Sequence, residues 1–173
     1  KKIHGLEIKP TTTAGTDFIL DWVRLDANVV WNFDSVDEIY GVNLISGLTV
    51  SGGNCSGTSG ADAYFHLSTD QRDINRDADR AFVDAKVFKK VRLKMSSSSA
   101  GNGQLFWWKR GQAGGEFSQV AFPVQAGART YEIDLSANPN WSGEVTRLRL
   151  DPIDIAGAGL VIDRLSIVPV MLA

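Results

Sequence analysis

Short runs in which apolar and polar residues alternate recur along most of the chain. In KVFKKVRLKM (86–95), Val87, Val91, Leu93 and Met95 are spaced to face inward, while lysine and arginine face outward. Such alternation is typical of β-strands that bury one face. It predicts strands in the following runs: 29–33, 40–50, 63–68, 86–95, 104–110, 116–124, 130–135, 145–150 and 160–168.

Turn-forming residues separate these runs. Two stretches rich in glycine and serine, SGGNCSGTSG (51–60) and SSSSAGNG (96–103), are predicted to be a loop and a turn. The helix candidate is DINRDADRAF (73–82), which is short and polar. About nine short strands with turns between them predict an all-β fold, an antiparallel β-sandwich or jelly roll, and disfavour βαβ units.

One segment near the start of the chain resembles another near its end. LEIKPTTTAGTDFILDWVRL (6–25) aligns without a gap with LRLDPIDIAGAGLVIDRLSI (148–167), and this alignment places Asp21 on Asp163. Each copy is expected to form a strand, a turn and a second strand. We interpret residues 1–27 as the C-terminal hairpin of an upstream repeat and residues 28–173 as one module. A pseudo-symmetric single domain and a chance match between two hairpins remain alternatives.

Composition removes several classes of function. The 173 residues carry 18 basic and 20 acidic side chains, and no basic stripe interleaves with aromatic residues. The sequence therefore gives no sign of a nucleic-acid partner. No apolar run is long enough to span a membrane. Cys55 is the single cysteine, which excludes an internal disulfide and any site built from several cysteines.

Three segments carry a resemblance to a known fold family. In VVWNFDSVDEIYGV, Trp31, Phe33, Asp34 and Gly41 match an opening motif, although Val42 replaces an aromatic residue. AFVDAKVFKKVRLKMSSSSAGNGQLFWWKR is similar to the central strands, and WSGEVTRLRLDPIDIAGAGLVIDRLSI resembles the closing segment. Residues 28–168 thus resemble the galactose-binding-like β-jelly-roll of many non-catalytic carbohydrate-binding modules. The resemblance implies this fold more strongly than it implies a sugar ligand.

The resemblance also implies a structural calcium ion between the first strand and the last. Asp34 and Asp163 are the positions that match the metal-binding pattern, and carboxylate and main-chain oxygens suit Ca²⁺. An aspartate within an apolar strand needs a partner. A salt bridge from Asp163 to Arg147, Arg149 or Arg164 is the alternative.

A second acidic cluster has the spacing of an EF-hand loop. Asp73, Asn75, Asp77 and Asp84 occupy its first, third, fifth and twelfth positions. However, Ala78 stands where the loop requires glycine, and the residues that follow alternate like a strand. We therefore interpret the segment as a solvated loop.

The adjacent Trp107 and Trp108 are the main candidates for contact with sugar, because aromatic faces pack against sugar rings. Neighbouring strand residues point to opposite faces. Leu105 and Trp107 would share one face, and Phe106, Trp108 and Arg110 the other. Arg110 favours Trp108 as the exposed tryptophan and is itself a candidate ligand-binding residue on that face. Packing of Phe106 and Trp108 beneath a neighbouring loop is an open alternative.

Other aromatic residues are assigned from the same patterns. Tyr64 and His66 share a face of AYFHLS and could extend a binding surface, although a surface role without ligand is an alternative for His66. Trp31 is expected in the core, and the family pattern gives Trp141 a structural role.

The sequence offers little for catalysis. Asp151 and Asp154 in DPID are explained as turn residues, and no other carboxylate pair suits a glycosidase. We expect a non-catalytic polysaccharide-binding module of a secreted or cell-surface protein, with neighbouring domains as further partners. The alternative is a spacer or adhesion module with a stabilising calcium ion and no sugar site. A sugar binder should expose Trp108 among polar neighbours, whereas a spacer should bury every tryptophan.

Overall fold

The computed structural model describes residues 29–68, 83–112 and 116–169. These residues form antiparallel strands and one short 3₁₀ helix, which confirms the all-β prediction. The elements are β1 (Val29–Trp31), η1 (Val36–Glu38), β2 (Ile39–Ser51), β3 (Asn54–Leu67), β4 (Val83–Asp84), β5 (Phe88–Ser97), β6 (Gly101–Lys109), β7 (Ser118–Val124), β8 (Gly127–Asp134), β9 (Glu144–Asp151) and β10 (Gly159–Pro169). No helix among these residues is long and apolar enough to cross a membrane.

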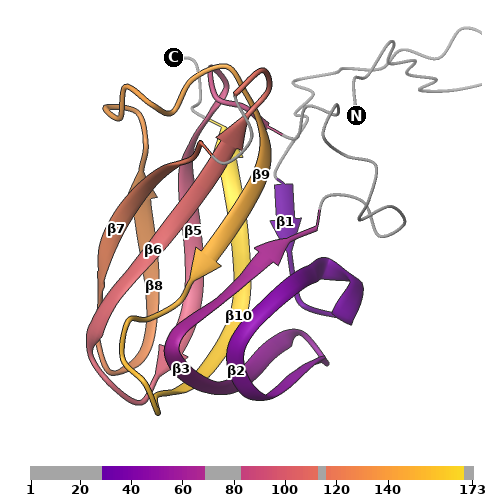
Figure 1. The fold of residues 1–173 in the computed structure, drawn as a ribbon, viewed down its shortest axis with the longest axis vertical. Helices are drawn as coiled ribbons and strands as arrows, with labels where there is room; N and C mark the ends of the chain where they lie inside the picture. The colour runs from indigo at the N-terminus through magenta and orange to yellow at the C-terminus, as the bar shows by residue number, and fades with distance from the viewer. Residues whose placement is uncertain (1–28, 69–82, 113–115, 170–173) are drawn as a thin grey trace, which may run out of the picture.

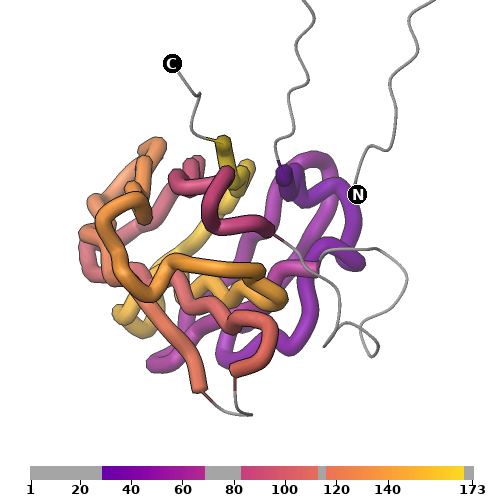
Figure 2. The backbone as a smooth tube through the Cα atoms, turned by 90° about the horizontal axis from the view of Figure 1, so that it is seen from above, coloured from indigo at the N-terminus to yellow at the C-terminus, as the bar shows by residue number. Residues whose placement is uncertain are grey.

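The strands form a nearly closed β-sandwich in the order β7-β6-β9-β3-β10-β5-β8 (Figure 1). Strand β3 joins the two layers, because residues 55–58 pair with β10 and residues 65–67 pair with β9. We call β2, β3, β9, β6 and β7 the first layer, and β10, β5 and β8 with β1 the second layer. Viewed from above, the β2–β3 hairpin lies on one side of the molecule and β7 and β8 on the other (Figure 2).

The core lies between the two layers and follows the predicted alternation. Leu105 and Trp107 of β6 are fully buried, as are Val91, Leu93 and Met95 of β5. The Trp107 ring meets the Trp141 ring edge to face, with centroids 5.2 Å apart.

Trp31 and Trp141 are buried, as expected. The Trp31 Nε1–H donates to the carbonyl of Ser68 at 2.6 Å, and the Trp141 Nε1–H donates to the carbonyl of Phe88 at 2.7 Å. Both indoles therefore bury their rings without leaving the N–H group unpaired.

The predicted loop at 51–60 is wrong, because most of it is the first half of β3. Only Gly52 and Gly53 form the turn of the β2–β3 hairpin, and both have positive φ. Further along, a Cβ atom on Gly57 would lie 2.6 Å from Cγ2 of Ile45. The glycines here permit close contact between β2 and β3 instead of forming a loop. Val87 is also wrongly placed: it lies outside β5 and is 46 % exposed.

The division into residues 1–27 and residues 28–173 stays a prediction. Residues 1–27 lie outside the described residues, as do the helix candidate at 73–82 and most of the acidic cluster. The later copy of the repeat does form β9, a turn and β10, as expected. Asp84, the described member of the acidic cluster, is exposed on β4 and accepts a hydrogen bond from the N–H of Lys86 at 2.9 Å.

Candidate functional site

The outer side of the first layer carries a group of aromatic side chains, which we call the aromatic face. It consists of Tyr40, Tyr64, His66, Phe106, Trp108 and Phe117, together with Arg147 and Arg149. The register of the strands brings them together. His66 of β3 and Phe106 of β6 both pair with Arg149 on β9, while Trp108 pairs with Arg147. Their neighbours in sequence, such as Leu148 and Leu150, point into the core.

Ring contacts run without a break from β2 to the start of β7. His66 stacks on Tyr40 with centroids 5.0 Å apart and lies 5.7 Å from Trp108. Phe117 lies 6.0 Å from Trp108 and 5.3 Å from Phe106. Strands lie about 4.8 Å apart, so these five strands span roughly 19 Å. The face is long enough for an extended ligand.

Arg149 lies at the centre of the aromatic face. Its guanidinium carbon is 3.6 Å from the Tyr64 ring centroid and 4.7 Å from that of Phe106. Nε and Nη2 each donate a hydrogen bond of 2.6 Å to Asp151. Two rings and a bidentate carboxylate therefore hold the guanidinium in place.

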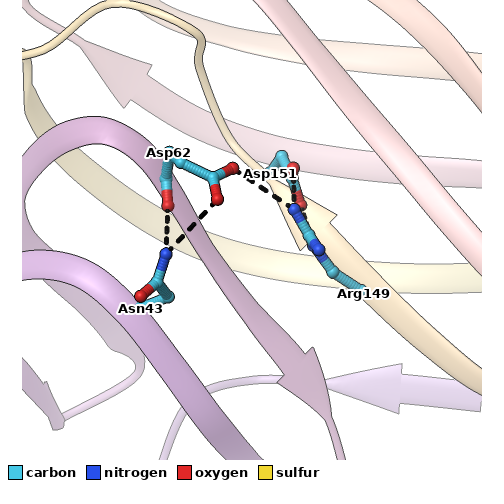
Figure 3. A network of polar contacts seen from close by, with 4 residues as sticks. All are labelled: Asn43, Asp62, Arg149 and Asp151. Carbon is cyan, nitrogen blue, oxygen red and sulfur yellow. Dashed lines mark hydrogen bonds and ion pairs between the residues drawn. The ribbon is translucent and has the colours of Figure 1, made fainter.

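A polar network extends from Arg149 to β2 (Figure 3). Nη2 of Arg149 lies 3.4 Å from Asp62 Oδ1, and Asn43 Nδ2 donates to the backbone carbonyl of Asp62 at 2.7 Å. Burial raises the pKa of Asp151, and hydrogen bonds from Arg149 oppose this shift. A buried ion pair of this kind adds little stability. The two hydrogen bonds that Asp151 accepts from Arg149 fix the guanidinium beside the Tyr64 and Phe106 rings, which indicates a positioning role for Asp151.

A small polar cavity adjoins this network at one end of the aromatic face. Its volume is about 130 Å³, and its polar lining residues are Asp62, Asn102, Gln104, Asp151 and Asp154. Asn102 donates to Asp154 through its backbone N–H at 2.8 Å and through Nδ2 at 3.0 Å, which lowers the pKa of Asp154. The cavity therefore presents carboxylate and amide groups next to the aromatic rings.

His66 is neutral near pH 7. Burial lowers its pKa to about 4, and the positive charges of Arg147 and Arg149 add to the shift. Its Nδ1 atom is buried without a hydrogen-bond partner among the described residues. The imidazole therefore contributes to the face as an uncharged ring.

The two adjacent tryptophans point to opposite sides, as predicted. Trp108 is partly buried on the aromatic face, with the guanidinium carbon of Arg147 5.2 Å from its ring centroid. Trp107 has no exposed surface and donates its Nε1–H to the carbonyl of Asn140 at 3.1 Å. The prediction that Trp107 binds the ligand is therefore wrong, because the core encloses its side chain completely.

The remaining predicted site residues separate into two groups. Tyr64 and His66 belong to the aromatic face beside Trp108. Arg110 follows the end of β6 and forms an ion pair with Glu144 instead. Phe106 is 7 % exposed and packs against Phe117. The alternative of packing beneath neighbouring residues therefore holds for Phe106, whereas Trp108 is only partly buried.

The calcium site remains a prediction. Strands β1 and β10 are paired, as a link between the first and last strands requires. However, Asp163 Oδ2 lies 3.2 Å from Lys94 Nζ, and the Glu38 carboxylate accepts the backbone N–H of Asp34 at 2.7 Å. No group of three or more His, Cys, Asp or Glu residues that could hold a metal occurs among the described residues. Within residues 29–68, 83–112 and 116–169, side chains alone thus provide no preformed donor set around Asp34 and Asp163.

Sequence reasoning missed several residues of the aromatic face. From the sequence, Arg147 and Arg149 are expected only as partners of Asp163, and Asp151 only as a turn residue. Their alternation with Leu148 and Leu150 in VTRLRLD was a usable signal, because it places all three on one side of β9. Tyr40 and Phe117 gave no such signal, since Tyr40 is placed by its pairing with His66 and Phe117 lies just before β7.

No protein-family model matches this chain, and no curated protein matches it. Its fold does match solved structures. An aspartate variant of the family 29 carbohydrate-binding module CBM29-2 superposes with a TM-score of 0.53 at 14 % identity, over 84 % of this chain and 86 % of that chain. The chain has the fold of a carbohydrate-binding module. At this identity the likeness shows the fold alone.

Two further structures show the same likeness. Another CBM29-2 variant, complexed with mannohexaose, has a TM-score of 0.53 and 14 % identity, over 84 % of this chain and 92 % of that chain. CBM86, a low-affinity xylan-binding module from the gut symbiont Roseburia intestinalis, has a TM-score of 0.52 and 9 % identity, over 83 % of this chain and 96 % of that chain.

Proposed function

We propose that this protein binds a polysaccharide chain along the aromatic face and does not cleave it. The observation that carries this proposal is the continuous row of rings around a fixed Arg149. Sugar rings have apolar C–H faces that pack on aromatic rings, and hydroxyl edges that require hydrogen bonds. The aromatic face supplies the first contact, and Arg149 with its polar network supplies the second.

The exposure of Trp108 favours sugar binding over a spacer role. A spacer without a ligand would bury its tryptophans, as Trp31, Trp107 and Trp141 are buried here. Trp108 instead remains partly exposed beside Arg147 and His66. Known structures of this fold include modules for mannohexaose and xylan, which supports the same class of ligand.

The proposal includes the setting of the protein. Weak sites gain avidity when modules are repeated along one polymer, which fits the resemblance between residues 6–25 and 148–167. We therefore place this module in a larger protein that acts outside the cell, next to related domains.

Retention on polysaccharides tests the proposal. The wild type, Trp108→Ala and Tyr131→Ala would be run in native gels containing mannan, xylan, cellulose derivatives or β-glucan. Tyr131 is a matched control, because it is a partly buried aromatic residue on β8, outside the aromatic face. We expect at least one polymer to retard the wild type and Tyr131→Ala but not Trp108→Ala. Equal retardation of Trp108→Ala, or no retardation by any polymer, would contradict the proposal.

A further inference from the structure

The second layer has a basic cavity on its outer side. Strands β5, β8 and β10 form it, and its volume is about 250 Å³. Its lining residues are Arg92, Lys94, Thr130, Arg164, Ser166 and Val168. Three cationic side chains and two hydroxyl groups from the second layer therefore surround one cavity, and this cavity shares no lining residue with the polar network of the first layer.

Strand register brings two of these cations face to face. Lys94 of β5 pairs directly with Arg164 of β10 on one side and with Thr130 of β8 on the other. Like charges directly opposite each other on a sheet are destabilising. An anion between Lys94 and Arg164 would remove this repulsion and accept hydrogen bonds from both.

Nearby carboxylates only partly neutralise the cavity. Glu132 Oε2 lies 3.1 Å from Arg92 Nε, and Asp163 Oδ2 lies 3.2 Å from Lys94 Nζ. No carboxylate lies within ion-pair distance of Arg164 among the described residues. The guanidinium of Arg164 is thus a fork-shaped donor open to a carboxylate or sulfate group.

Carboxylates lie between the basic side chains around the cavity, and this arrangement limits which anions fit. Glu132 and Asp163 would repel a polymer with a negative charge at every contact, such as nucleic acid. A polymer whose acidic groups are carried on separate sugar rings can place one group in the cavity and keep its backbone outside.

We propose that this cavity binds the carboxylate or sulfate group of an acidic polysaccharide, as a second site independent of the aromatic face. The choice of a polysaccharide rests on the function proposed above. Arg164 and Lys94 hold the anionic group, and the exposed hydroxyl of Thr130 contacts the adjacent ring.

Affinity electrophoresis with polygalacturonate, dextran sulfate and duplex DNA tests this site. The variant is Arg164→Ala, which changes an exposed side chain. The control is Arg129→Ala, which removes an equal charge from β8 outside the cavity. We expect polygalacturonate or dextran sulfate to retard the wild type, at least fivefold weaker binding for Arg164→Ala, and no change for Arg129→Ala. Retardation should weaken with added salt, because the contacts are exposed to solvent.

The two acidic polymers distinguish carboxylate from sulfate as the source of the anion. Lack of retardation by both, an equal loss in Arg129→Ala, or stronger binding to DNA would overturn the proposal. Trp108→Ala separates the two sites: it should lose neutral polysaccharides and retain the acidic one. Failure of the aromatic face alone would therefore leave the acidic-polymer result unchanged.

Discussion

Several contacts that are weak individually hold the Arg149 guanidinium in one orientation, in which it can donate hydrogen bonds. Tyr64 and Phe106 enclose its guanidinium, and Asp151 takes two of its hydrogen bonds. A lysine has no planar fork and cannot make this bidentate contact. The contribution of Arg149 to binding should therefore depend on shape as well as charge.

Arg149→Lys tests that dependence. We expect about tenfold weaker polysaccharide binding, which corresponds to loss of one charged hydrogen bond of about 1.4 kcal/mol. Isothermal titration calorimetry measures the affinity. Arg129→Lys, on the second layer, is the matched control and should bind like the wild type. Full affinity in Arg149→Lys would show that charge alone suffices.

The lowered pKa of His66 predicts how the stability of the fold depends on pH. Its pKa is about 4 in the folded protein, below the ordinary value of 6.5, so folding favours the neutral ring. That contribution is complete above about pH 6.5 and is lost as pH falls toward 4. The urea midpoint of the wild type should therefore fall more between these values than that of His66→Gln. If the urea midpoints of both proteins fall equally, other titratable groups control the loss of stability at acid pH.

At the scale of elements, the β2–β3 hairpin depends on glycine. A Cβ atom on Gly57 would lie 2.6 Å from Ile45 Cγ2 and 3.1 Å from the carbonyl oxygen of Ser46. Contacts this short force the strands apart. The hairpin carries Asn43, Tyr64 and His66, so its position also sets one half of the aromatic face.

Gly57→Ala should therefore destabilise the fold by about 1–3 kcal/mol. The measurement is urea unfolding followed by tryptophan fluorescence. Gly159→Ala is the control, because a Cβ atom there would be no closer than 3.7 Å to its nearest neighbour, Ser98. Equal stability of the two variants would show that β2 adjusts to the added methyl group.

This hairpin also shows what the sequence predicted and what it did not. Alternation located most of the strands and separated Trp107 from Trp108, because burial of one face imposes a period of two residues. Composition failed at 51–60, because glycine indicates a turn or a close contact equally well. Pairing between distant strands placed Arg149 between Tyr64 and Phe106, and local pattern contains no information on such pairing.

At the scale of the whole molecule, the two layers present different outer surfaces. The first layer carries aromatic rings with a polar network, and the second carries the basic cavity beside Lys94 and Arg164. The two outer surfaces of the β-sandwich can thus each contact a separate polymer chain. Substitutions on one surface should leave the other unchanged, because the core separates them.

Calcium is the remaining expectation for the whole molecule. An ion held by Asp34 and Asp163 at a hundred times its Kd would add about 2.7 kcal/mol to the stability. Adding EDTA should then lower the melting temperature of the wild type but not of Asp163→Asn. An unchanged wild-type melting temperature would assign Asp163 to its ion pair with Lys94 alone.

The central claim is that sugar binds on the aromatic face, and chemical-shift mapping tests it most directly. Labelled protein would be titrated with mannohexaose, xylohexaose and cellohexaose, and amide shifts followed along every strand. The account predicts that at least one of these shifts residues of β3, β6 and β9, centred on Tyr64, Trp108 and Arg149. Shifts confined to β5 and β8, or none with any of the three, would contradict it.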